Sequence, residues 1–482
     1  MTESTRASAS ASTPEDLLGN LHRRMGALHR QKDLGSRALG VPGWDVQLWQ
    51  HGRELLQTGG QPELETARSE TDLYLATEIY ANGGHTALIG DFVRALSAGG
   101  ASNPHLLVTN IHQHTKKNLP EKVRVRTGIP AENILILDGP SLSERLTELV
   151  RHMRTLRPRR TFFFHHPDDP LPCAAAQPEW TGQRVLVHHA DSAPCFGLHL
   201  PGTQVIELNP FAQAMSSVLG VPSRLLPLCS PDPGLRPHGF LHDGVMVTAS
   251  SGSAHKFVRP YLYSYADTVR VILQATGGRH VHIGPLDAAA LGTLHQTLIA
   301  AGIEPARFVH VPWTESVANC LWEHHCDVYL SSFPIDGART YVEVIASGTP
   351  YLRHMRRGVA SIDEPYPVWR TWEELSALLH ECRDRTRLQT MADKLRAIYE
   401  STHTPQAFAR RLADILAADF SAADACSPEH EKHVLHSFVR TLTQAVAQQA
   451  ERIEQLESAA LDAASTSPRT LLSRLRVWFS GR

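Results

Sequence analysis

A glycine-containing turn followed by a helix carries the residue types that hold a phosphate. An apolar run over 328–333 predicts a buried strand, and 334–337 has the composition of a tight turn. A helix is expected over 340–347, where Gly348 ends it. The first N–H groups of a helix lack intrahelical partners, and the helix dipole favours negative charge at that end. The stretch therefore predicts an anion site.

Charged side chains near this turn suit a nucleoside diphosphate. Arg339 supplies a planar fork for phosphate, and Glu343 lies one helical turn on, where a carboxylate could accept from ribose hydroxyls. Lys256 lies in a second glycine loop, directly after a predicted strand, where ligands of parallel sheets gather. The residues expected to bind such a nucleotide in this half are Gly252, Ser253, Lys256, Asp336, Gly337, Ala338, Arg339, Thr340 and Glu343.

Histidines follow the predicted strands of the first half of the chain. Gly84 and His85 lie in a glycine turn, and the sequences H-H-P-D-D (165–169) and H-H-A-D (188–191) each come directly after a strand. A glycine turn lets a phosphate approach the backbone, so Gly84 is also expected at the donor. An imidazole can be tuned to accept a proton near neutral pH. The candidates for a catalytic base are His189 with Asp191, then His166 with Asp168, and His85.

Strands and helices alternate in two long stretches. This alternation predicts an α/β protein with two doubly wound parallel sheets, each covered on both faces. A proline-rich segment, 222–237, separates the two units. The expected organisation is a helical region at 14–70, a first domain at 71–222 and a second at 223–420, with the helix 405–416 crossing back to the first.

The turn and its flanks resemble the nucleotide-sugar site of glycosyltransferases with two facing Rossmann-like domains, the GT-B architecture. Gly337, Arg339, Thr340, Glu343 and a closing G-x-P (348–350) fit the pattern, whereas the usual second acidic residue has only Asp336 as a counterpart. The resemblance implies sugar transfer from a nucleotide-sugar to a hydroxyl acceptor across a cleft. It implies no cofactor and no metal, because backbone N–H groups and the cationic pair can carry the leaving charge.

Two other functions compete with sugar transfer. The sequence His166-Pro167-Asp168-Asp169 resembles the zinc-binding signature of de-N-acetylases, although Pro170 stands where that family has an acidic residue. A noncatalytic scaffold that assembles others through its C-terminal helix is the third hypothesis. It leaves Lys256, Arg339 and Glu343 without a role.

Composition and the two ends of the chain limit the partners that we expect. The net charge of −2 gives no basic field for nucleic acid, and the seven scattered cysteines fit a reducing, cytoplasmic compartment. Residues 1–13 are expected to be a disordered lead-in. A long helix or coiled coil at 428–464 could support a homo-oligomer through 430–460. The basic amphipathic segment 468–482 could lie on the inner membrane, as in bacterial surface-polysaccharide glycosyltransferases, whose acceptor is a glycan or lipid-linked.

Overall fold

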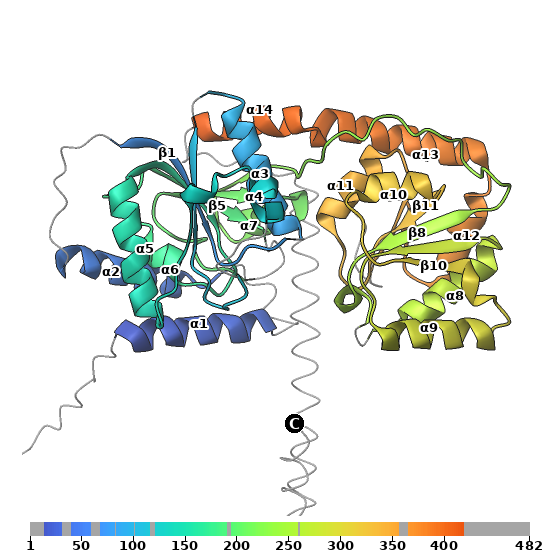
Figure 1. The fold of residues 1–482 in the computed structure, drawn as a ribbon, viewed down its shortest axis with the longest axis horizontal. Coiled ribbons are helices and arrows are strands. Elements are labelled where there is room, and N and C mark those ends of the chain that lie inside the picture. The colour runs from blue at the N-terminus through green and yellow to red at the C-terminus, as the bar shows by residue number, and fades with distance from the viewer. Residues whose placement is uncertain are drawn as a thin grey trace, which may run out of the picture.

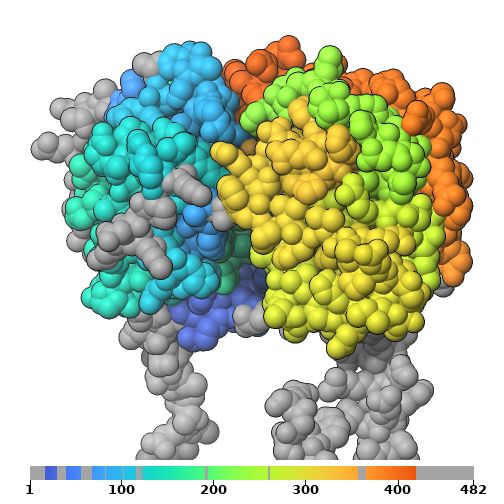
Figure 2. Space-filling model, turned by 45° about the vertical axis from the view of Figure 1, so that its right-hand side comes forward, coloured from blue at the N-terminus to red at the C-terminus, as the bar shows by residue number. Residues whose placement is uncertain are grey.

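The chain forms two α/β domains, each built on one parallel sheet. The computed structural model describes residues 14–30, 40–58, 68–81, 83–100, 102–115, 121–189, 194–258, 261–355 and 365–418. Figure 1 shows the two sheets in separate lobes, and Figure 2 shows that the lobes lie side by side. The predicted pair of doubly wound domains is confirmed.

The N-terminal sheet has the strand order β3-β2-β1-β4-β5-β6-β7, and its strands pair in parallel. The order reverses between β1 and β4, which makes the carboxyl ends of these strands the place where such sheets bind ligands. The strands are β1 (Ser69–Ala76), β2 (Asn103–Val108), β3 (Ile134–Ile136), β4 (Pro158–Phe164), β5 (Gln183–His188), β6 (Thr203–Glu207) and β7 (Ser223–Leu225).

Helices cover both faces of this sheet with buried apolar side chains. One face carries α1, α2, α5, α6 and α7, and the other carries α3 and α4. A capping box at Ser141 and Glu144 fixes the start of α5. The helices are α1 (Pro14–Arg30), α2 (Pro42–Thr58), α3 (Gly84–Ser97), α4 (Glu121–Thr127), α5 (Leu142–Leu156), α6 (Leu171–Ala175) and α7 (Pro210–Val218).

The C-terminal sheet has the order β10-β9-β8-β11-β12-β13, with α8, α9 and α12 on one face and α10 and α11 on the other, and α13 packs against both groups. The strands are β8 (Val247–Ser251), β9 (Arg279–Ile283), β10 (Phe308–Val311), β11 (Val328–Leu330), β12 (Tyr351–His354) and β13 (Val368–Trp369). The helices are α8 (Tyr265–Thr276), α9 (Ala288–Ala300), α10 (Val317–Glu323), α11 (Ala338–Ala346), α12 (Trp372–Glu381), α13 (Arg385–Ile398) and α14 (Pro405–Ala417).

The last described helix, α14, returns from the C-terminal domain and packs on the N-terminal one (Figure 1). The ring of Phe408 meets that of Phe92 of α3 edge-on, with 5.4 Å between centroids. The side-chain amides of Gln183 and Gln204 donate to backbone carbonyls near the end of α14. The expected crossing helix is therefore confirmed, and it joins the two lobes at the top of the view.

The expected domain boundaries need two corrections. Strand β7 (Ser223–Leu225) pairs with β6, so the N-terminal sheet extends past residue 222. Residues 405–417 were counted within the bounds of the second domain although they were expected to cross back, and they bury their apolar side chains in the N-terminal domain. The sequence pattern of a short strand or helix shows which of its faces is buried but not which domain it packs against. Domain boundaries at such segments are therefore hard to predict. The expected segments 1–13, 428–464 and 468–482 lie outside the described residues.

The described helices include none with the length and apolar character needed to cross a membrane. The same part of the chain contains six cysteines, each of them a buried, free thiol.

A buried histidine on β9 should make the fold sensitive to acid. His280 is fully buried between Thr248 and Ser250, and burial lowers its pKa from 6.5 to about 3. Between these two pH values His280 is protonated in the unfolded chain and neutral in the folded chain, so stability falls as the pH drops below 6.5. The loss from this residue approaches about 2 kcal/mol at pH 5.

We expect His280→Gln to weaken this pH dependence. Urea unfolding at pH 7 and pH 5 should show a smaller difference in the free energy of unfolding for His280→Gln than for the unaltered chain. The exposed His295 gives the matched control, His295→Gln, which should keep the original difference. An unchanged pH dependence in His280→Gln would contradict the assignment.

Candidate functional site

The start of α3 in one domain faces the start of α11 in the other. Gly84 is the first residue of α3, and a side-chain carbon placed on it would lie 3.9 Å from Cβ and Cδ of Arg339 in α11. Gly83 precedes it with φ 128°, a conformation that favours glycine. Arg126 of α4 donates to the carbonyl of Gly83 at 3.0 Å and fixes the turn. Two helix N-termini thus point at one interdomain space.

Lys256 covers the N-terminus of α11. The N-cap of this helix is Gly337, which has no side chain to cap the N–H groups of the first turn. A Cβ on Gly337 would lie 3.0 Å from Nζ of Lys256 and 3.2 Å from Oγ1 of Thr340. A larger residue here would push the ammonium and the hydroxyl back by a few tenths of an ångström, so glycine allows their closest approach to the helix start. Lys256 also donates to the carbonyl of Asp336 at 3.3 Å.

The environment of Lys256 leaves its charge weakly compensated. Burial lowers the pKa of Lys256, and the Asp336 carboxylate only partly opposes this effect. An anion placed at the α11 N-terminus would restore the pKa, because it would favour the charged ammonium. Gly252, with φ 147°, permits the loop to turn here, since a Cβ on it would meet the Lys256 side chain at 2.9 Å. Ser253 lies in the same loop, and its hydroxyl forms a hydrogen bond with the ring of His255.

Arg339 joins the two domains. Its guanidinium contacts the carboxylate of Asp91 on α3 at 2.5 Å and lies 3.9 Å from that of Glu343. Burial lowers the pKa of Arg339, but Asp91 more than offsets this, so the pKa is raised overall. The sequence predicted Arg339 as a phosphate ligand. In the structure its guanidinium also links the two domains through Asp91. A bound phosphate would share this guanidinium with the Asp91 carboxylate.

Glu343 lies one turn into α11, as predicted, and remains partly exposed. Burial raises the pKa of Glu343, and the neighbouring Arg339 opposes the rise. Its carboxylate accepts from the backbone N–H of Val317 at 3.3 Å. A carboxylate that makes a single backbone hydrogen bond keeps acceptor capacity for the hydroxyls of a ligand.

Asp336 is engaged by its own domain. Its carboxylate accepts from the N–H of Gly337 at 2.7 Å and from the hydroxyl of Tyr351 at 3.1 Å, and it pairs with Arg353 at 3.1 Å. These contacts shape the turn before α11. Its expected contact with the donor stays a prediction.

Three predicted histidines converge at the carboxyl ends of the N-terminal strands. The ring centroids of His85 and His189 lie 4.5 Å apart, and His166 lies 5.7 Å from His85 and 6.1 Å from His189. The structure thus brings one histidine each of H-H-P-D-D and H-H-A-D next to that of the glycine turn, and their expected role as a catalytic base stays a prediction. Asp191, the expected partner of His189, lies outside the described residues.

Hydrogen bonds assign the protons of two of these rings. Nε2 of His85 lies 2.7 Å from the carbonyl of Phe164, and Nε2 of His189 lies 3.0 Å from that of His165. Because a carbonyl oxygen only accepts, each Nε2 carries the proton and each Nδ1 carries the lone pair. Nδ1 of His85 is buried and has no hydrogen-bond partner among the described residues. Its lone pair is therefore used by no described residue.

The histidine group is neutral at pH 7. Burial is the main cause in each ring: it lowers the pKa of His166 to about 3, and it also lowers those of His85 and His189. Neighbouring imidazoles further lower the pKa values of His166 and His189, because two protonated rings at this separation would repel each other. The neutral rings therefore present lone pairs rather than positive charge.

The residues of the de-N-acetylase hypothesis do not converge. Asp169 is fully buried and accepts from Thr77 at 2.7 Å, Thr109 at 2.5 Å and the N–H of Leu171 at 3.0 Å. Its role is to join strand ends. Among the described residues, the carboxylate of Asp168 has metal-ligand spacing with two histidines, but His166 is not one of them.

Sequence patterns did not single out Asp91, Arg126 or His112. Asp91 lies in the interior of α3 and pairs with Arg339 of the facing domain, whereas Arg126 lies in the last turn of α4 and donates to the carbonyl of Gly83. His112 lies near three other histidines in a loop after β2. The sequence signal that could have pointed to His112 is the histidine-rich segment I-H-Q-H.

Comparison with known proteins identifies the fold. No family profile matches the sequence, and no curated protein matches it. The structure of Anabaena Alr3699/HepE in complex with UDP and glucose matches with a TM-score of 0.54 at 12% identity, over 72% of this chain and 99% of that one. The lipopolysaccharide outer core galactosyltransferase WaaB in its apo form matches with a TM-score of 0.53 at 9% identity, over 72% of this chain and 99% of that one.

TarM matches to a similar degree, with a TM-score of 0.54 at 7% identity over 74% of this chain and all (100%) of that one. The similarity spans both lobes, because the matched region covers nearly the whole of each of these chains. Sequence identity over that region is low. The chain therefore has the two-domain GT-B fold of these glycosyltransferases.

Proposed function

We propose that the protein transfers a sugar from a nucleoside-diphosphate sugar to a hydroxyl acceptor. The observation that carries the proposal is the convergence of Lys256, the uncapped N-terminus of α11 and the glycine turn of α3 on one interdomain space. A diphosphate needs this combination of fixed N–H groups and a desolvated cation. Glu343 stands one turn deeper, at a distance suited to a ribose.

The acceptor would meet the donor on the N-terminal side. His85 directly follows Gly84, and a side-chain carbon placed on Gly84 would lie 3.9 Å from Arg339, so we place the ring of His85 near the diphosphate. Its Nδ1 lone pair would take the proton of the acceptor hydroxyl, and His166 and His189 would orient the acceptor. The Lys256 ammonium would stabilise the charge that develops on the leaving diphosphate.

The solved neighbours suggest what the donor and acceptor are. HepE was crystallised with UDP and glucose, and WaaB is a galactosyltransferase of the lipopolysaccharide outer core. A uridine diphosphate hexose and a glycan or lipid-linked acceptor of the bacterial surface are therefore the first substrates to test. Such an acceptor would place the enzyme in the cytoplasm, at the inner face of the membrane.

A nucleotide screen tests this proposal. The thermal midpoint of the full chain should rise with one of UDP, GDP, CMP and dTDP, because a ligand that binds only the native state stabilises it. Glu343→Ala should lose most of this rise, since the ribose hydroxyls lose their acceptor. The exposed Glu304 gives the matched control, Glu304→Ala, which should respond like the unaltered chain. No response to any nucleotide would reject the proposal.

A further inference from the structure

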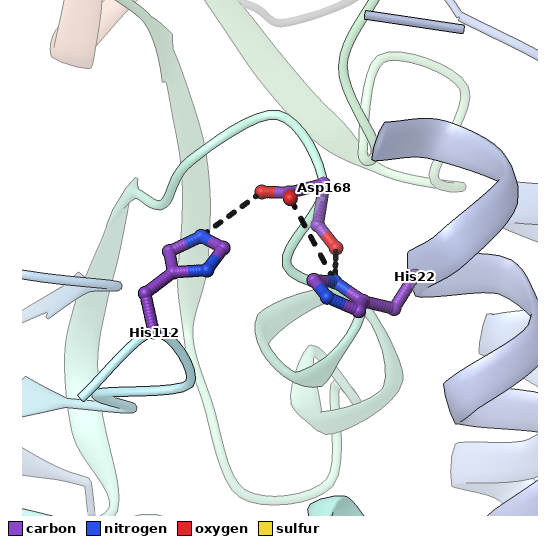
Figure 3. A group of neighbouring side chains, drawn as sticks. All are labelled: His22, His112 and Asp168. Carbon is purple, nitrogen blue, oxygen red and sulfur yellow. Dashed lines mark hydrogen bonds and ion pairs between the residues drawn. The ribbon is translucent and has the colours of Figure 1, made fainter. Parts of the chain in front are cut away.

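Three side chains from distant parts of the N-terminal domain meet near the carboxyl ends of β2 and β4. His22 comes from α1, His112 from the loop after β2, and Asp168 from the loop after β4 (Figure 3). Their nitrogen and carboxylate oxygen atoms all lie within 4.8 Å of one another. The side chains are partly exposed, at 30% for His22, 26% for His112 and 20% for Asp168, so an ion could enter.

The separations are close to those of a metal site. Zinc–ligand bonds of about 2.0–2.1 Å in a tetrahedron place ligand atoms about 3.3–3.4 Å apart. Nε2 of His112 lies 3.3 Å from Oδ1 of Asp168, and Nδ1 of His22 lies 3.8 Å from Oδ2. Nδ1 of His22 also lies 2.9 Å from the carbonyl of Asp168, and metal binding would replace that hydrogen bond. Small rotations of the two rings therefore complete the geometry.

Buried carboxylates hold both ligand loops in place. Glu78 accepts from the backbone N–H of His112 at 3.1 Å and from that of Thr115 at 2.7 Å, which fixes the loop after β2. Asp169 fixes the loop after β4 through its bonds to threonine hydroxyls. Ligands held by such supporting contacts lose little freedom when a metal binds.

The charge of the group also suits a cation. Among the described residues, the ion-pair partners of the Asp168 carboxylate are two imidazoles, and no lysine or arginine pairs with it. Two imidazoles and one carboxylate are a ligand set typical of zinc, and they leave a coordination position for water.

We propose that His22, His112 and Asp168 bind one divalent ion of the zinc class. The ion fastens α1 to the carboxyl edge of the N-terminal sheet. The site is separate from Lys256 and α11, which lie in the other domain. It also differs from the de-N-acetylase set, because it uses His22 and His112 and leaves Asp169 as a buried support. The proposal stands whether or not the sugar-transfer proposal does.

Zinc titration of the full chain, made without a polyhistidine tag and stripped with a chelator, tests the site. Calorimetry should detect one high-affinity Zn²⁺ that His22→Gln, His112→Gln and Asp168→Asn each lose. His295→Gln, an exposed histidine on α9, should keep it. Saturating Zn²⁺ should raise the thermal midpoint of the unaltered chain by about 5 °C, and that rise should vanish in the three variants.

The metal-free thermal midpoint of each variant separates loss of the site from loss of the fold. Co²⁺ should give visible absorption of a low-symmetry site in the unaltered chain, and none in a folded His22→Gln. Zinc binding that survives in His22→Gln would overturn the proposal. Zinc binding that is lost in His166→Gln but kept in His22→Gln would also overturn it and would restore the de-N-acetylase set. Because nucleotide binding is measured separately, a failure here leaves the sugar-transfer proposal standing.

Discussion

Replacing Lys256 with methionine should lower the rate of sugar-nucleotide cleavage by about 10²–10³-fold, the usual cost of removing one fixed group that stabilises developing charge. Methionine keeps the length of the side chain and removes the ammonium that lies over Gly337. The leaving diphosphate then gains charge without its cation. The readout is release of the nucleoside diphosphate, with water or an added glycan as acceptor, from the sugar nucleotide whose base the screen identifies.

The loss should come from chemistry and binding and not from unfolding. Lys256 is half-buried and its pKa is lowered by burial, so its removal costs the free protein little stability. Lys394→Met, which removes an exposed lysine of α13, is the matched control and should retain full activity. A Lys256→Met protein that cleaves donor at the unaltered rate would remove the ammonium from the mechanism.

Asp169→Ala should destabilise the N-terminal domain by about 3 kcal/mol. Its carboxylate is fully buried and ties β1, β2 and the loop after β4 through Thr77, Thr109 and the N–H of Leu171. Burial raises the pKa of Asp169, and these bonds oppose the rise. Alanine would leave the donors without an acceptor in the core, which costs more than the bonds themselves contribute.

Urea unfolding followed by circular dichroism measures this effect. The matched control is Asp393→Ala, which removes an exposed carboxylate of α13 and should change the free energy of unfolding by less than about 0.5 kcal/mol. Asp169→Asn should fall between the two, because the amide keeps one acceptor oxygen. Full stability in Asp169→Ala would mean that the strand ends are held by other contacts.

The sequence predicts the repeating part of this fold well. The strand expected over 328–333 begins at Val328 as β11, and the helix expected over 340–347 is α11 (Ala338–Ala346), because the hydrophobic period and the end signals agree there. Short elements were missed. Strand β6 (Thr203–Glu207) and helix α7 (Pro210–Val218) follow a segment of mixed composition, in which the pattern is too brief to distinguish a strand from a loop.

The candidate site was predicted where it depends on local motifs. Gly337, Lys256 and Glu343 lie at strand ends or a helix start, and the structure places them together as the rule for parallel sheets requires. The pairing of Arg339 with Asp91 joins residues 248 positions apart, and no local pattern carries that information. The zinc-class site was not predicted for the same reason, because His22 and Asp168 are 146 positions apart and meet only when α1 packs on the domain.

The most direct test of the donor site is calorimetric titration of the stabilising nucleoside diphosphate into the full chain, Lys256→Met and Lys394→Met. We expect one site per chain, unchanged affinity in Lys394→Met and at least about tenfold weaker binding in Lys256→Met, since a charge-assisted contact to phosphate contributes roughly 1.5–3 kcal/mol. Equal affinity in all three proteins would contradict the placement of the diphosphate between Lys256 and the start of α11.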